Sequence, residues 1–117
     1  NIMAQNFRRY AMKGIGTSAV AMSANFNSFD TIVGINLANR AATAIQASVY
    51  ILINGAADNE TNRYYLIKNA PIPSGGTLQV LDGGAKFVVQ SLDRMWILSD
   101  TASSIDSWVS AVDDIST

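Results

Sequence analysis

The chain of 117 residues contains neither cysteine nor histidine. Without cysteine it can form no disulfide framework and perform no thiol chemistry. Without histidine it lacks the most common general base and the most common transition-metal ligand, and a Ser-His-Asp triad is impossible. The composition therefore favours a protein that is not an enzyme, with no catalytic residues, no bound metal and no cofactor.

Charge is scarce as well. Only 15% of the residues are charged and the formal net charge is −1, whereas about 25% are charged in a typical soluble domain. This balance provides no basic field for nucleic acid, and no apolar run comes near the roughly 18 residues of a membrane span. We expect no nucleic-acid and no membrane partner, and we interpret the low charge as a sign that other protein covers part of the surface.

What the sequence does contain is alternation of apolar and polar residues. Ile45, Ala47, Val49, Ile51 and Ile53 fall on one face of an extended segment, and Thr31, Val33, Ile35 and Leu37 do the same in an earlier one. Similar segments, separated by turn residues, predict strands at residues 7–13, 17–24, 30–39, 45–53, 63–68, 76–82, 85–90, 93–100 and 105–112.

This pattern predicts an all-β protein, a single antiparallel β-sandwich that is jelly-roll-like or Ig-like, with about eight strands and no long helix. We expect residues 1–18 to form an N-terminal arm or first strand, and residues 19–117 to form the sandwich domain. The arm could lie on a neighbouring subunit. Residues 39–48 are rich in alanine, but Asn39 interrupts the run and the period from Ile45 onward is two, which excludes a helix there.

Turn residues are concentrated in NAPIPSGGTLQVLDGG, residues 69–84. Pro71 and Pro73 fix φ and lack the amide donor, so this part must be extended, at a sheet edge or outside a sheet. Residues 74–76 allow the chain to reverse, and residues 82–84 are a strong signal for a hairpin into residues 85–90. We therefore predict a crossing between sheets followed by a tight hairpin.

Two segments, residues 49–53 and 95–98, are apolar on both faces. One face of a sandwich strand meets the core and the other meets water, so a second cover is needed. Without a helix in the chain, a subunit or lattice partner would supply it; the alternative is ordinary exposed hydrophobic residues.

The two tryptophans add to this expectation. A turn near residues 100–103 would make Trp96 and Trp108 face each other across a hairpin, with Met95, Ile97, Ile105 and Val109 in the core. The tryptophans would then lie on the second face, where another subunit covers at least one of them. The candidate interface residues are Trp96, Trp108, Tyr50, Leu52, Arg8 and Arg9.

Two charged clusters have alternative interpretations. Asp58 and Glu60 could bind calcium or imitate a glycosidase pair, but the spacing does not fit an EF-hand, and a solvated hairpin loop is the prediction. Arg8, Arg9 and Lys13 could contact nucleic acid or form ion pairs with residues 113–114 near the other end of the chain.

Three segments carry a resemblance to a known family: YLIKNAPIPSGGTLQVL (65–81), KFVVQSLDRMWILS (86–99) and SSIDSWVSAVDD (103–114). Together with residues 29–51, they resemble small β-sandwich virion proteins of tailed bacteriophages, of the cyanophage and marine phage type. One departure is visible, because the usual Gly-Asp turn is replaced here by Leu92-Asp93.

The resemblance implies a non-enzymatic virion structural protein with no catalytic residues. We expect a capsid decoration (cement) protein that stabilises the head lattice, located in the virion, with the major capsid protein or other virion proteins as partners. A homo-oligomer is expected, a trimer being favoured. The alternatives are a tail, neck or fibre attachment module, or a receptor- or carbohydrate-binding sandwich that uses Tyr50, Tyr64, Tyr65, Trp96 and Trp108.

Overall fold

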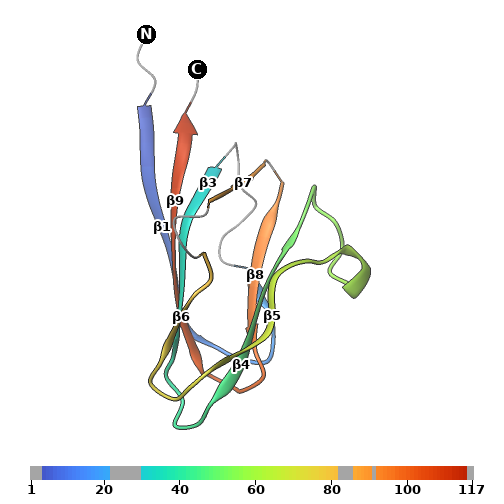
Figure 1. Cartoon of the computed structure of the whole chain (residues 1–117). Coiled ribbons are helices and arrows are strands. Elements are labelled where there is room, and N and C mark those ends of the chain that lie inside the picture. Colours follow the sequence, from blue (N-terminus) through green and yellow to red (C-terminus); the bar gives the residue numbers. More distant parts are fainter. Residues whose placement is uncertain (1–3, 22–29, 82–85, 91, 116–117) are drawn as a thin grey trace.

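Two antiparallel sheets face each other in the structure (Figure 1), a computed structural model that describes residues 4–21, 30–81, 86–90 and 92–115. The first sheet has the strand order β1-β9-β3-β6, with β7 also paired to β3, and the second sheet has the order β2-β8-β4-β5. The elements are β1 (Ala4–Ile15), β2 (Val20–Ala21), β3 (Asp30–Asn39), β4 (Ile45–Leu52), the short 3-10 helix η1 (Glu60–Asn62), β5 (Tyr64–Ile72), β6 (Thr77–Gln79), β7 (Phe87–Val89), β8 (Arg94–Ser99) and β9 (Ile105–Ile115). The predicted all-β sandwich is confirmed, and the described ranges contain no helix of the length and apolarity that crossing a membrane would require.

The strand order identifies the sandwich as a jelly roll. The chain neighbours β1 and β2, β3 and β4, β5 and β6, and β8 and β9 lie in opposite sheets. An Ig-like sandwich instead keeps several pairs of consecutive strands within one sheet. Of the two predicted arrangements, the jelly roll is the one observed.

The inward rows of the two sheets form the core. Ile45, Ala47, Val49 and Ile51 are buried along β4, as their alternation predicts, whereas Ile53 is 44% exposed at the turn that follows. The four residues predicted for the core of β8 and β9 are buried too: Met95, Ile97, Ile105 and Val109. Apart from Ala47, each such side chain stabilises the fold by about 1.5–3 kcal/mol, so the core fixes which face of every strand points inward.

Strand β3 departs from the predicted alternation. Ile32, Ile35 and Leu37 are fully buried, whereas Val33 is 38% exposed. The ladder between β3 and β9 shifts by one residue between Ile32 and Gly34, so Val33 is the extra residue of a β-bulge. Strict alternation predicted the wrong face for Val33 because a bulge reverses the parity of the residues before it.

The predicted hairpin between β8 and β9 is wrong. The two strands belong to opposite sheets, and the residues between them carry the chain across the sandwich. Polar groups hold this crossing, because Ser99 and Ser104 are both buried and share a hydrogen bond between their hydroxyl groups. The Ser104 hydroxyl also bonds to the Thr101 carbonyl oxygen, and the Ser104 amide donates to the Ile15 carbonyl.

The segment around the prolines confirms one prediction and corrects another. Strand β5 contains Pro71 and lies at the edge of the second sheet, and residues 73–76 then lead to β6 in the first sheet. This is the predicted edge position and crossing. The predicted hairpin between the next two strands is wrong, because β6 and β7 both pair antiparallel with β3 and so run in the same direction; residues 82–85 themselves lie outside the described residues.

The turn between β7 and β8 contains a strained residue. Leu92 has φ +74°, in the left-handed region that glycine adopts readily and a branched side chain does not. The Asp93 carboxylate holds the turn by accepting hydrogen bonds from the Gln90 amide at 2.8 Å and the Asn54 amide at 3.2 Å. Leucine thus occupies a left-handed position that glycine would adopt without this strain.

We expect Leu92→Gly to stabilise the protein by about 1 kcal/mol. Glycine removes the left-handed penalty of about 1–2 kcal/mol, but part of this gain is lost because glycine also raises the conformational entropy of the unfolded chain. The measurement is urea unfolding of both proteins. Gly75→Ala is the matched opposite change, since Gly75 has φ +73° and an added Cβ would meet nothing within 4 Å. It should destabilise by about 1 kcal/mol; a stabilising Gly75→Ala or a destabilising Leu92→Gly would contradict this account of the turn.

Candidate functional site on the outer faces of the sheets

Tyr50 lies on the outer side of β4, yet it is 0% exposed. Its ring stacks on Trp96 of β8, with centroids 6.4 Å apart and an interplanar angle of 6°, and contacts Tyr65 of β5 at 5.6 Å. The Arg63 guanidinium carbon lies 4.1 Å from the centroid of the Tyr50 ring. An aromatic cluster closed by a cation therefore covers the middle of the outer face of the second sheet.

The connection between β4 and β5, residues 53–63, forms this cover. Asn54 and Gly55 both have positive φ and the Ala56 amide donates to the Ile53 carbonyl oxygen, which is the type I′ turn that Asn-Gly favours. The Gly55 amide donates to the carbonyl oxygen of Leu92, which fixes the turn to the neighbouring loop. The rest of the connection then folds toward β4 and ends in η1.

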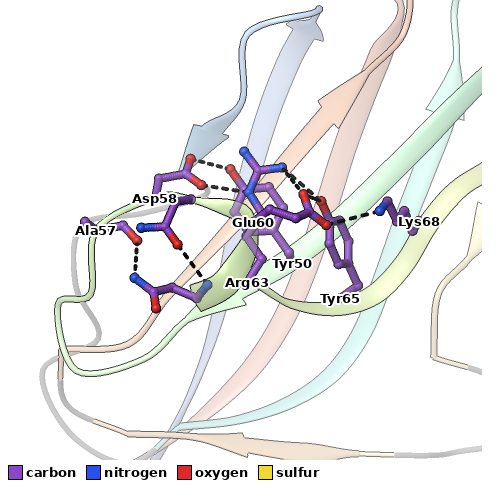
Figure 2. Close-up of polar contacts among 9 residues, drawn as sticks. Tyr50, Ala57, Asp58, Glu60, Arg63, Tyr65 and Lys68 are labelled. Carbon is purple, nitrogen blue, oxygen red and sulfur yellow. Dashed lines mark hydrogen bonds and ion pairs between the residues drawn. The ribbon is translucent and has the colours of Figure 1, made fainter.

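A polar network anchors this connection to the sheet (Figure 2). The Asp58 carboxylate accepts a hydrogen bond of 2.6 Å from the Tyr50 hydroxyl and one of 2.7 Å from Arg63 Nε. The Tyr65 hydroxyl accepts from Arg63 Nη1 and donates to Glu60 at 3.0 Å. Lys68 Nζ donates to the other Glu60 oxygen at 3.1 Å. The buried Tyr50 hydroxyl is thereby paired, as a desolvated polar group must be.

The network shifts pKa values in opposite directions. Burial alone would raise the pKa of Asp58, but the hydrogen bonds from Arg63 and Tyr50 and the Arg63 charge hold it below its usual value. The hydrogen bonds from Lys68 and Tyr65 hold the pKa of Glu60 below its usual value. Desolvation, followed by the hydrogen bond to Asp58, raises the pKa of the Tyr50 hydroxyl.

This arrangement corrects one sequence-based interpretation and confirms another. Tyr50 and Leu52, which is 3% exposed, are covered within the protomer by the chain itself and present no surface to a partner. The predicted solvated hairpin loop is confirmed, because residues 53–63 join the antiparallel strands β4 and β5 and both Asp58 and Glu60 are exposed there; the two carboxylates also form ion pairs with Arg63 and Lys68. Among the residues that the structure describes, no group of three or more acidic side chains could hold a metal ion.

The outer face of the first sheet has no such cover among the described residues. Phe7 is 81% exposed, Val88 60%, Trp108 50% and Val33 38%. The register places Phe7, Val112, Thr31 and Val88 opposite one another across β1, β9, β3 and β7. A mostly apolar row, interrupted by Thr31, therefore crosses these four strands, with Trp108 farther along β9.

The remaining predicted interface residues lie on different surfaces. Trp108 pairs in register with Ala11 of β1, and Trp96 pairs with Tyr50 of β4. The tryptophans thus point outward, as predicted, but from opposite sheets, so they do not face each other. Arg9 lies over the Trp108 ring, its guanidinium carbon 5.5 Å from the centroid, and Arg8 is exposed on the same strand.

A pocket of about 380 Å³ opens beside Trp96, where the connection between β4 and β5 meets β8. It is lined by Leu52, Gly55, Ala56, Asp58, Leu92, Arg94 and Trp96. Two buried donors belong to its lining residues, Trp96 Nε1 and Arg94 Nε, and neither has a hydrogen-bond partner among the described residues. No sequence pattern indicated this pocket, because it depends on how the connection folds onto β8.

Comparison with known proteins shows relatives only at the level of fold. No protein-family model matches the chain, and the curated proteins give no significant match. Among solved structures, a chain of the disulfide-linked pili that form Bacillus endospore appendages is similar over 96% of this chain and 88% of its own length, with 13% identity and a TM-score of 0.56. A chain of the T13 IBDV viral particle is similar over 92% of this chain, with 11% identity and a TM-score of 0.52, but the match spans only 30% of that longer chain. A chain of the Drosophila NLP core is similar over 97% of this chain and 100% of its own, with 7% identity and a TM-score of 0.48.

Stability should decline on both sides of a plateau in pH. The pKa values of Asp58 and Glu60 are depressed by folding, so their contribution is present above the unfolded values of about 4 and is lost as pH falls through the folded values. The pKa of Tyr50 is raised, so its contribution is present below about 10 and is lost as pH rises. We expect Tyr50→Phe to lower the free energy of unfolding by about 1–2 kcal/mol at neutral pH and to reduce the alkaline decline.

Urea unfolding at a series of pH values measures both the free energy of unfolding at neutral pH and its decline at alkaline pH. The alkaline decline is reduced rather than abolished, because desolvation and the neighbouring Asp30 raise the pKa of Tyr10 as well. Tyr64→Phe is the control, since Tyr64 is 60% exposed and should change neither quantity. An equal effect of the two substitutions would contradict the role assigned to the Tyr50 hydroxyl.

Proposed function

We propose that this chain is a non-enzymatic structural subunit of a virion, a decoration protein that binds the capsid lattice of a tailed bacteriophage. The observation that carries the proposal is the row on the first sheet from Phe7 to Val88, which no other described segment covers, with Trp108 farther along β9. A monomer that remained free in solution would rarely expose a contiguous row of this kind. Large aromatic side chains on a flat face are typical anchors of protein interfaces.

Three further observations support an assembly role. The sequence resembles small virion proteins of tailed phages over most of its length. The jelly-roll fold is shared with subunits of two assemblies, a pilus and a viral particle. The acidic side chains of the 53–63 connection are engaged in holding the fold rather than grouped around a reactive centre.

Electron microscopy of the source particle tests the location directly. Density for the sandwich at regular positions over the head, in hundreds of copies, is the expected result, with a trimer as the expected oligomer. Density confined to the tail, neck or fibres would replace decoration by an attachment role. Absence of the chain from purified particles would contradict both.

The two tryptophans provide a matched pair of variants. We expect Trp108→Ala to change the free energy of unfolding by no more than about 1 kcal/mol, chiefly the cation–π contact with Arg9, but to reduce retention of the protein on particles. Trp96→Ala removes the ring stacked on Tyr50 and should destabilise the isolated domain by about 2–3 kcal/mol. Thermal unfolding and particle sedimentation measure the two quantities. Full retention of a folded Trp108→Ala variant would show that this face is not the contact.

Receptor or carbohydrate binding is a second candidate, favoured by the pocket beside Trp96. Its lining includes an indole and a guanidinium whose buried donors have no partner among the described residues, and sugars bind through ring contacts combined with hydrogen bonds. The other aromatic residues weigh against an open platform, because Tyr50 is buried and Tyr65 is held between Arg63 and Lys68. A glycan array distinguishes the candidates: a specific signal that is lost in Arg94→Ala would favour sugar binding.

A further inference from the structure

The edges of the two sheets differ in how well they are protected from pairing with another strand. The second sheet ends in β2, which has two residues, and in β5, whose ladder with β4 is interrupted twice and which contains Pro71. The far side of the first sheet is formed by β6 and β7, with three residues each. Among the described edge strands, only β1 is long, free of proline and paired without interruption over most of its 12 residues, and such an edge is a template for a further strand.

The other side of β1 is fully occupied by β9. Its register with β9 is continuous from Ala4 to Met12, and the one irregularity lies between Met12 and Ile15, beside Gly14. No other described strand pairs with β1, which forms the outer margin of the first sheet (Figure 1). A strand that added there would therefore find an extended and regular backbone over about nine residues.

The side chains on the outer face of β1 define what such a strand must carry. Alternation places Phe7, Arg9, Ala11 and Lys13 in one outward row, and all four are exposed. Arg9 lies opposite Ser110 of β9, so no acidic side chain stands directly across from it. In an antiparallel addition, carboxylates opposite Arg9 and Lys13 and apolar groups opposite Phe7 and Ala11 would complement this row.

The chain itself has no described edge that fits. Strand β5 carries Lys68, and β2, β6 and β7 contain no acidic residue. Pairing β1 with the β1 of a second copy would bring two basic rows together, which cross-strand pairing disfavours. None of the described strands therefore supplies the complement, and we assign it to a different polypeptide.

We propose that the free edge of β1 is a docking site for an extended acidic strand of another protein, which adds to the first sheet by backbone hydrogen bonding. The inference rests on the proposed assembly role and names the chemistry of the partner segment. The added strand would extend the sheet next to Phe7 and cover part of that exposed ring. Affinity would come from the backbone ladder, and specificity from the carboxylates opposite Arg9 and Lys13.

Synthetic peptides test the proposal on the whole chain. The acidic probe is Glu-Thr-Val-Thr-Glu-Thr-Val, ordered so that antiparallel pairing sets its two glutamates opposite Lys13 and Arg9. The matched probe has lysine in place of both glutamates. We expect the acidic probe to slow hydrogen exchange of amides in residues 4–15 and to bind about tenfold more tightly than the basic probe. Two further versions of the acidic probe carry N-methyl groups, one on the odd-numbered amides and one on the even-numbered amides. Only one of these two sets of amides points toward β1, so only one of the two versions should lose binding.

Charge reversal on the protein supplies the second arm. Arg9→Glu and Lys13→Glu should each lower the preference for the acidic probe, whereas Lys86→Glu, the same change at an exposed residue beside β7, should leave it intact. The wild-type comparison of the two probes stands even if a variant fails to fold.

The inference would be overturned if neither probe protected the β1 amides from exchange, or if both probes bound equally well. Self-association that Lys13→Glu abolishes would instead identify a second copy of the chain as the partner. Tighter binding of a single-stranded oligonucleotide than of the acidic probe would identify nucleic acid as the ligand. Particle retention is measured separately. A protein that stays on particles while the amides of β1 exchange freely there would refute docking at this edge and leave the structural role standing.

Discussion

Strand β4 is apolar on both faces, so it has to be covered twice, and the organisation of the molecule follows from this constraint. The core covers one face. The connection of residues 53–63 covers the other, because Tyr50 can be buried there only if its hydroxyl finds a partner, and Asp58 provides one. Arg63 then neutralises the carboxylate and closes the aromatic cluster. A potential interaction surface becomes an internal interface of the protomer.

The first sheet has no equivalent connection among the described residues, and this asymmetry separates a closed side from an open one. On the closed side, four charged residues, Asp58, Glu60, Arg63 and Lys68, form a network with the tyrosines. On the open side, exposed apolar residues lie beside the cations of β1, and Arg9 lies over the Trp108 ring. Of the seven large apolar side chains that are exposed among the described residues, four lie on the first sheet: Phe7, Val33, Val88 and Trp108.

The same asymmetry appears at the sheet edges. Proline, ladder irregularities and short strands limit three of them, whereas β1 offers a long backbone edge whose protection consists only of positive charge. Lysine and arginine at an edge prevent indiscriminate pairing, and for the same electrostatic reason they make the edge selective for acidic strands. Protection from aggregation and recognition of a partner are thus compatible uses of one set of residues.

The sequence by itself determined the strands, the inward rows of β4, β8 and β9, the edge position of Pro71 and the outward direction of both tryptophans, because these depend on alternation and on local backbone restrictions. It could not determine which strands pair. Leu92 in a glycine position and the extra residue Val33 are invisible to periodicity, and β8 and β9 are adjacent in the chain but belong to opposite sheets. Two further features were decided by the tertiary structure. The row of Phe7, Val112, Thr31 and Val88 exists only because sheet pairing brings together strands that are far apart in sequence. The cover over Tyr50 exists only because the 53–63 connection folds back onto β4.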